Sequence, residues 1–237
     1  SDKIVQTGVQ IADIAGGSYP AVMACLSALI SRMNTGKGQF VDVAMVDCSL
    51  PLMSFYMAEV LNAGRSYGRQ EHALAGSIPN YNIYQCMDGK WIALGSLEPK
   101  FWMGFCQLVG KVDWMNKIFN ATLKPEVDEL FLTKTRDEWV EFAKDSDICL
   151  TAILEMDELE ADTYLQKRNM FVEHEHPAYG KYKGINQPIK FGNTPSSIGW
   201  APPLMGEDNE DILKSLGYSA EEIQALSDSK VIVKGDS

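Results

Sequence analysis

The spacing of apolar residues in the first part of the chain changes from helical to strand-like and back. Residues 18–33 carry apolar side chains at helical intervals, with Ser18 as the predicted N-cap and a predicted stop at Gly36. Residues 39–47 alternate apolar and polar side chains, which predicts a strand. Over residues 47–63 the spacing of apolar residues returns to the helical period, which predicts a helix. This region therefore predicts helix, strand and helix in succession.

The middle of the chain predicts a small α/β unit. Residues 64–80 are polar and rich in glycine, so we expect a loop and a domain boundary there. The Asp88-Gly89 pair separates two short apolar runs and has the turn chemistry of a β-hairpin. A helix is expected from Pro99 to about Val109.

The last part of the chain predicts shorter elements. Helices are expected over residues 126–144 and 155–168, and turns with short strands over residues 173–197. Two short helices close the chain, the second opened by Ser219 with Glu222 at capping-box spacing.

Charge and composition narrow the function classes. The chain has 237 residues, a formal net charge of -11 and no dominant run of lysine and arginine, which argues against nucleic-acid or anionic-membrane partners. No apolar run is long and charge-free enough to be expected to span a bilayer. The five cysteines are scattered, without a C-x-x-C pair, and predict reduced thiols in a cytoplasmic protein.

One carboxylate, Asp13, lies between apolar residues and a Gly-Gly-Ser turn in the stretch GVQIADIAGGSYP. An ionised carboxylate is costly to bury unless it is paired or hydrogen-bonded. We expect it upstream of the Ser18 cap, where backbone N–H groups from Ile14 to Gly17 hold it. The local pattern leaves two interpretations open, a structural aspartate and a reactive one.

A second carboxylate, Glu98, follows the apolar run WIALGSL and precedes a helix that has Pro99 in its first turn. A glutamate at this place can have a purely structural role, in which its charge complements the helix dipole. It can also be a catalytic group, because a strand-to-helix corner aims a side chain from rigid elements.

The three histidines offer little chemistry of their own. His72 lies in the glycine-rich loop, and His174 and His176 form an H-x-H in an acidic turn. No second cluster of cysteine or histidine accompanies them, so no metal site is expected.

Three motifs carry a resemblance that covers essentially the whole chain. They are TGKGQFVDVAMVD (residues 35–47), GSLEPKF (residues 95–101) and GEDNEDILKSLGYS (residues 206–219). In this order they resemble the family III CoA-transferases, also called the CaiB/BaiF family.

The resemblance implies an α/β fold with a large Rossmann-like CoA-binding domain and a small α/β domain. Residues 1–65 would be the tail of the large domain and the connecting helix, residues 66–185 the small domain, and residues 186–237 the return to the large domain. Only twelve residues precede Asp13, so the resemblance implies a C-terminal part without the N-terminal half of the large domain. It also implies an interlocked homodimer when full length, and a coenzyme A thioester as substrate without a further cofactor.

Within the family, GSLEPKF is most similar to α-methylacyl-CoA racemases. This resemblance implies that Asp13 and Glu98 belong to a network that exchanges the α-proton of a 2-methylacyl-CoA through an enolate. Inversion needs one base on each face of the substrate, and Glu98 would support the second base, a histidine upstream of Asp13 that this sequence does not contain. Gly16 and Gly17 would donate N–H groups to the enolate oxygen, or serve only tight packing.

Two alternatives stay open. In a CoA-transferase proper, Asp13 would be a nucleophile that forms a mixed anhydride and then an aspartyl-CoA thioester, with the Gly64–Gly76 loop as a candidate cover. In a non-catalytic component, the chain would only bind or support a partner that holds the histidine.

Overall fold

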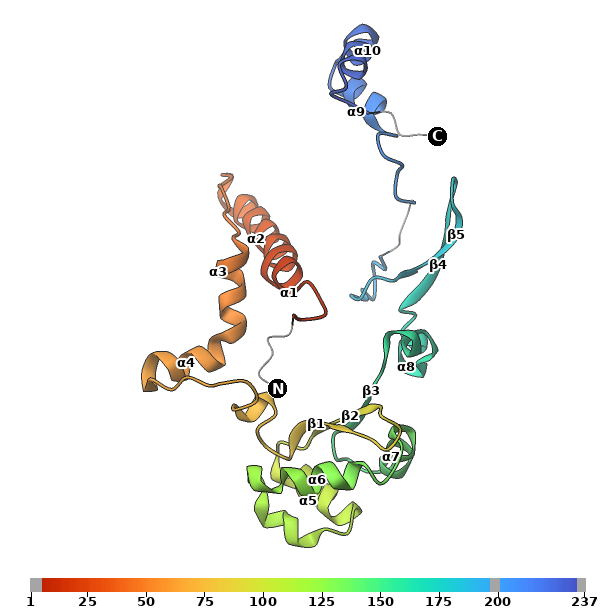
Figure 1. Ribbon diagram of the computed structural model, residues 1–237. Coiled ribbons are helices and arrows are strands. Elements are labelled where there is room, and N and C mark those ends of the chain that lie inside the picture. The colour runs from red at the N-terminus through yellow and green to blue at the C-terminus, as the bar shows by residue number, and fades with distance from the viewer. Residues whose placement is uncertain (1–5, 197–200, 234–237) are drawn as a thin grey trace. The chain divides into compact units, whose positions relative to one another are not determined.

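The computed structural model describes residues 6–196 and 201–233 (Figure 1). Its internal contacts form two compact units, Ser1–Thr151 and Ala152–Ser237. Helices and strands are mixed, as the sequence predicts. The division at residues 65 and 185 concerns the complete family fold and stays a prediction.

A long helix opens the first unit. It consists of α1 (Ile11–Asp13), a π turn η1 (Ile14–Ser18) and α2 (Tyr19–Thr35), without a break. The predicted N-cap is wrong, because Ser18 has helical dihedrals and the π turn carries the hydrogen-bond ladder through it. The predicted stop is confirmed, since Gly36 adopts φ 70° and donates its N–H to Arg32.

The strand predicted over residues 39–47 is wrong. These residues are without regular structure up to Ala44, and α3 (Met45–Ser49) follows. A strand needs a hydrogen-bonded neighbour, and no strand of the described residues pairs with this segment. The predicted helix over residues 47–63 is confirmed but interrupted at Pro51, giving the 3-10 helix η2 (Leu50–Met53) and α4 (Ser54–Ala63).

The predicted hairpin is confirmed and forms most of a small sheet. Strands β1 (Tyr81–Gln85) and β2 (Trp91–Gly95) pair antiparallel, and β3 (Leu150–Ile153) completes the order β1-β2-β3. Gly89 in the turn has φ 79°, which glycine adopts without strain. The helix expected from Pro99 is α5 (Pro99–Leu108).

Aromatic side chains dominate the core on one face of this sheet. The helices that contribute side chains to this core are α5, η4 (Val112–Lys117), η5 (Ala121–Leu123), α6 (Lys124–Phe131) and α7 (Arg136–Ala143). Their buried residues include Trp102, Phe105, Trp114, Phe131 and Trp139, against Tyr84, Ile92 and Leu94 of the strands. This core holds the β2–α5 corner rigidly.

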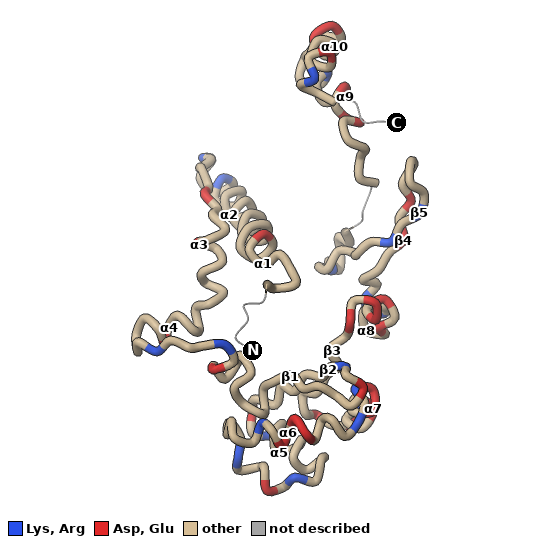
Figure 2. The backbone as a smooth tube through the Cα atoms, in the orientation of Figure 1, with Lys and Arg blue, Asp and Glu red and all other residues tan. Residues whose placement is uncertain are grey.

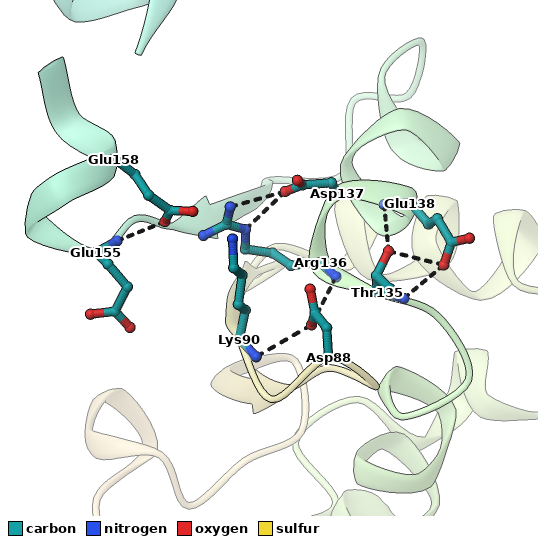
Figure 3. A network of polar contacts seen from close by, with 8 residues as sticks. All are labelled: Asp88, Lys90, Thr135, Arg136, Asp137, Glu138, Glu155 and Glu158. Atoms are coloured by element: carbon teal, nitrogen blue, oxygen red, sulfur yellow. Dashed lines mark hydrogen bonds and ion pairs between the residues drawn. The ribbon is translucent and has the colours of Figure 1, made fainter. Parts of the chain in front are cut away.

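One helix was predicted over residues 126–144, and the structure has two, α6 and α7. The break lies at Thr135, which caps α7 in a capping box with Glu138 (Figure 3). Asp88 of the hairpin turn accepts the backbone N–H groups of Lys90 and Arg136, each at 3.3 Å. The turn is thus tied to the start of α7.

The second unit contains short elements. They are η6 (Met156–Ala161), α8 (Thr163–Lys167), β4 (Phe171–His176), β5 (Gly180–Ile185), α9 (Asn209–Ser215) and α10 (Ala220–Asp228). The helix predicted over residues 155–168 is divided at Asp162, which caps α8. The antiparallel β4–β5 hairpin confirms the strands expected within residues 173–197, of which Ser197 lies outside the described residues. The Ser219–Glu222 capping box is also confirmed.

The helices at the start of the chain expose apolar side chains. Figure 2 shows few charged positions along α2, α3 and α4, and the sequence of these helices carries only Arg32, Asp47 and Glu59. The continuous helix Ile11–Thr35 is long and apolar enough to cross a membrane by length and composition. We expected no segment that is long and apolar enough to span a bilayer, and this expectation is wrong. The helix reaches this length because it begins seven residues earlier than predicted. A core helix of a soluble protein can have the same length and apolar composition.

Candidate functional site

Asp13 ends α1, and its side chain is exposed. The expected arrangement, with free N–H groups around the carboxylate, is wrong, because the residues that follow belong to the helix. The Ile14 N–H donates to the Gln10 carbonyl oxygen at 3.0 Å, and the Ser18 hydroxyl donates to the Asp13 carbonyl oxygen at 3.0 Å. The carboxylate thus lies where a π turn interrupts the α-helical ladder, an irregularity that is frequent at functional sites.

Gly16 is buried where α3 packs against the π turn. A Cβ atom at Gly16 would lie 2.2 Å from the Ser49 Oγ and 3.0 Å from the Met45 carbonyl oxygen. A Cβ at Gly17 would come no closer than 3.4 Å, to the Met45 side chain. Packing therefore explains why position 16 is a glycine, but it does not explain the glycine at position 17. That the N–H groups of both glycines donate to an oxyanion stays a prediction.

Glu98 is the N-cap residue of α5, in extended conformation at the end of the segment that follows β2. Its carbonyl oxygen accepts the N–H groups of Phe101 and Trp102 at 3.1 and 3.2 Å, while its side chain is exposed and makes no capping bond. Trp102 is fully buried, and its indole N–H donates to the Trp114 carbonyl oxygen at 3.0 Å. The corner is anchored by backbone and core, which leaves the carboxylate unused by the fold.

Two fully buried polar residues fix the same corner. The Ser96 hydroxyl donates to the Ile148 carbonyl oxygen at 2.6 Å, and the Ser96 carbonyl oxygen accepts from the Asn80 amide at 3.1 Å. The amide oxygen of Asn80 in turn accepts the N–H of Phe119 at 3.2 Å. Three segments distant in sequence therefore converge two residues before Glu98.

A pocket of about 410 Å³ lies on the open face of the hairpin, beside this corner. Its lining includes Leu74 and Gly76 from the preceding loop, Tyr81 from β1, Ala93 and Gly95 from β2, and Cys149. Gly95 is three residues from Glu98. The pocket is mostly apolar in its lining, as small-molecule sites are.

Cys149 also lines the pocket, and no sequence pattern had marked it as a candidate. It adopts φ 54°, and its carbonyl oxygen accepts the Gly95 N–H at 2.8 Å. Partial burial, followed by the Asp147 and Glu98 carboxylates, raises the pKa of its thiol. The thiol therefore keeps its proton to higher pH than an ordinary cysteine.

His72 is buried rather than free in its loop. Its Nδ1 accepts the Leu74 N–H at 3.2 Å, its Nε2 lies 3.7 Å from Glu59, and the rings of Phe55, Tyr56 and Tyr67 surround it. With Nδ1 occupied, this imidazole is a structural group in the turn rather than a free base.

His174 and His176 each lie against a tyrosine ring, Tyr182 and Tyr179 respectively. Nδ1 of His176 accepts the N–H groups of Ala178 and Tyr179, and its Nε2 lies 2.8 Å from the Pro202 carbonyl oxygen. Among residues 6–196 and 201–233, no three histidine, cysteine, aspartate or glutamate side chains gather as metal ligands.

Within the described part of the chain, neither the Asp13 nor the Glu98 carboxylate takes part in a hydrogen bond or ion pair. Asp13 is the last residue of α1, directly before the π turn, and Glu98 is the N-cap residue of α5.

Comparisons with known proteins cover most of the chain. The model of the CoA-transferase family III matches residues 1–209. Alpha-methylacyl-CoA racemase of Homo sapiens is 30% identical over 228 residues, and formyl-CoA:oxalate CoA-transferase of Bradyrhizobium sp. (strain ORS 278) is 29% identical over 255 residues. Each of these alignments covers 94% of this chain and 59% of the relative.

The fold is also similar to a solved structure. A mutant of Rv3272 from Mycobacterium tuberculosis superposes with a TM-score of 0.71 at 22% identity, over 87% of this chain and 55% of that one. The chain spans somewhat more than half the length of the proteins it matches. On the family match and these similarities, the chain belongs to the CoA-transferase family III.

Proposed function

We propose that the chain is part of an acyl-CoA racemase, similar to alpha-methylacyl-CoA racemase, that exchanges the α-proton of a 2-methylacyl-CoA thioester. The observation that carries this proposal is Glu98, an exposed carboxylate that the fold does not use, anchored at the β2–α5 corner beside a pocket. The 30% identity to the human racemase supports it.

In this proposal, Asp13 takes or gives the α-proton on one face of the substrate. Removing that proton leaves an enolate, with its negative charge on the thioester oxygen, and a second group returns a proton on the opposite face. Glu98 supports that second group, and the N–H groups of Gly16 and Gly17 stabilise the enolate oxygen. The coenzyme A thioester is the substrate, and no further cofactor or metal takes part.

The wider assembly is proposed on the same resemblance. We propose a cytoplasmic homodimer whose full-length protomers interlock, so that residues outside this chain supply the histidine base and the remainder of the CoA-binding domain. Nucleic acid and membrane surfaces are not among the proposed partners, in keeping with the net charge of -11.

A second function is supported by the formyl-CoA:oxalate CoA-transferase relatives, at 28–29% identity. Here the Asp13 carboxylate attacks the thioester carbonyl, the C–S bond breaks, and CoA leaves as the thiolate. The thiolate then attacks the aspartyl carbonyl of the mixed anhydride, giving aspartyl-CoA and the free acid. A second carboxylic acid reverses both steps and leaves as its CoA thioester.

One experiment separates these functions. The product of the complete reading frame is incubated with a single enantiomer of a 2-methylacyl-CoA in D2O, and α-deuterium is followed by mass spectrometry. Deuterium uptake with loss of chirality supports the racemase, provided that Asp13→Ala and Glu98→Gln reduce it and the exposed control Glu141→Gln does not. A CoA adduct that is trapped on Asp13 before a second acid is added, and that disappears when the acid is added, supports the transferase if no exchange occurs. Absence of both reactions contradicts both functions and leaves a non-catalytic component.

A further inference from the structure

The pocket beside Glu98 owes one wall to a short turn that a buried histidine caps. The turn is the 3-10 helix η3 (Ala73–Ala75), and His72 is its N-cap residue, with φ -88° and ψ 146°. Nδ1 of His72 accepts the Leu74 N–H at 3.2 Å, and its carbonyl oxygen accepts the Ala75 N–H at 2.8 Å. The segment that provides Leu74 and Gly76 to the pocket therefore begins on this one residue.

The protonation pattern of His72 follows from these contacts. A backbone N–H can only donate, so Nδ1 carries no proton, and the proton of the neutral ring lies on Nε2. Nε2 lies 3.7 Å from Glu59 Oε1 of α4, and Glu59 also accepts a hydrogen bond from the Tyr67 hydroxyl. A carboxylate facing Nε2 favours the one tautomer that leaves Nδ1 free to cap the turn.

Packing fixes the ring in this orientation. The rings of Tyr56, Tyr67 and Phe55 lie edge-on to it, with centroids at 4.5, 4.9 and 5.3 Å. The His72 side chain is 7% exposed, although the loop around it is polar and largely open. A histidine that served only to cap a surface turn would not need such an enclosure.

The far end of the turn is fixed by a different residue. The Asn82 amide donates to the Gly76 carbonyl oxygen at 2.9 Å, and Gly76 has φ 94°, where a Cβ would lie 3.2 Å from the Asn82 amide oxygen. The wall is therefore held at both ends, by His72 on the side of α4 and by Asn82 on β1.

We propose that His72, oriented by Glu59, is a positioning residue that sets the Ala73–Gly76 turn as the wall of the substrate pocket beside Glu98. This inference rests on the proposed function, because it takes that pocket as the place of the acyl-CoA. It assigns His72 to substrate affinity rather than to proton transfer, so its loss should raise KM more than it lowers kcat.

Two variants of the full-length protein separate the capping bond from the bulk of the ring. His72→Ala removes both, whereas His72→Asn restores a side-chain oxygen at the N-cap, where asparagine is favoured, without restoring the ring. Tyr56→Leu is the matched control, since it alters the enclosure and leaves the capping bond.

The first readout is amide hydrogen exchange of the peptide that contains Leu74 and Ala75, measured without substrate. We expect His72→Ala to accelerate exchange there about tenfold, as for the loss of one capping bond, and His72→Asn to return it close to wild type. The second readout is the kinetics of α-proton exchange, where KM should rise roughly tenfold in His72→Ala and recover in His72→Asn.

The outcomes separate this inference from the proposed function. If His72→Asn is no better than His72→Ala in hydrogen exchange, the residue acts by packing, and the inference is overturned. The same holds if the turn is protected in all variants, or if Tyr56→Leu matches His72→Ala. If the wild type catalyses no α-proton exchange, the proposed function fails, while the amide measurement still decides whether His72 holds the turn.

Discussion

The Ser96 hydroxyl donates its hydrogen bond to the Ile148 carbonyl oxygen inside the core, two residues before the exposed Glu98 carboxylate. The bond joins the end of β2 to the chain just before β3, segments 52 residues apart in sequence. A fully buried serine thereby holds the position of a carboxylate that is proposed to support the reaction.

Replacing Ser96 by alanine leaves the Ile148 carbonyl oxygen buried without this donor. We expect the free energy of unfolding to fall by about 1–3 kcal/mol, measured by urea denaturation. The exposed Ser66→Ala is the control and should change the free energy by less than about 0.5 kcal/mol. Equal stability of Ser96→Ala and wild type would mean that the buried bond does not hold the corner.

Gly16 and Gly17 should respond differently to alanine. The Cβ of Gly16→Ala meets Ser49 at 2.2 Å and the Met45 backbone at 3.0 Å, so we expect a loss of about 1–3 kcal/mol. Gly17→Ala has room and replaces glycine in a helix, so the free energy of unfolding should stay or rise by up to about 1 kcal/mol.

A double variant tests the stated cause. Because Ser49 Oγ is the nearest atom, Gly16→Ala with Ser49→Ala should recover part of the loss, measured as a double-mutant cycle. Strict additivity would show that the clash lies elsewhere. Both alanine variants keep their backbone N–H, so activity lost by Gly17→Ala without lost stability would point to substrate contact there.

Two buried thiols predict a loss of stability at alkaline pH. Burial is the main cause that raises the pKa of Cys86 to about 11 and that of Cys106 to about 12, from the ordinary thiol value of 9.0. Between pH 9.0 and the raised pKa of each thiol, the unfolded chain releases the thiol proton and the folded chain keeps it. The free energy of unfolding therefore falls as pH rises through this range. Each thiol contributes a slope of roughly 1.4 kcal/mol per pH unit at most.

The check is urea denaturation at pH 8 to 11 for wild type and Cys106→Ala. The variant should lose less stability over this range, whatever its starting value. The exposed Cys25→Ala serves as the control and should keep the wild-type slope. Parallel curves for Cys106→Ala and wild type would contradict the assignment.

Local signals were sufficient where the neighbours in sequence decide the conformation. The Asp88-Gly89 turn, Pro99 after Glu98 and the Ser219–Glu222 capping box each specify their element within a few residues, and all three are confirmed. Glu98 at the strand-to-helix corner could be found for the same reason.

Other features depend on distant partners and were missed. The alternating residues 39–47 form no strand because no described strand pairs with them. Ser18 looks like a cap, but the π turn around Gly16 continues the helix through it, and that turn packs on α3. The contacts of His72 and Cys149 are made with Glu59 and Gly95, which lie 13 and 54 residues away in sequence.

We predict that protein rather than lipid covers the apolar helix Ile11–Thr35. Exposed apolar side chains are not confined to α2, since Leu50, Phe55 and Leu61 of η2 and α4 are 52%, 59% and 75% exposed. These later helices of four and ten residues are too short to span a bilayer. A surface shared by helices of such different length fits a protein partner better than a membrane.

The 237-residue chain should therefore bind an apolar dye strongly and self-associate, yet stay in the soluble fraction when floated with neutral and with anionic vesicles. Leu26→Lys, on the exposed face of α2, should reduce dye binding and self-association together. If the chain floats with vesicles and Leu26→Lys abolishes flotation, lipid covers this helix, and the proposal of a protein without membrane partners is wrong.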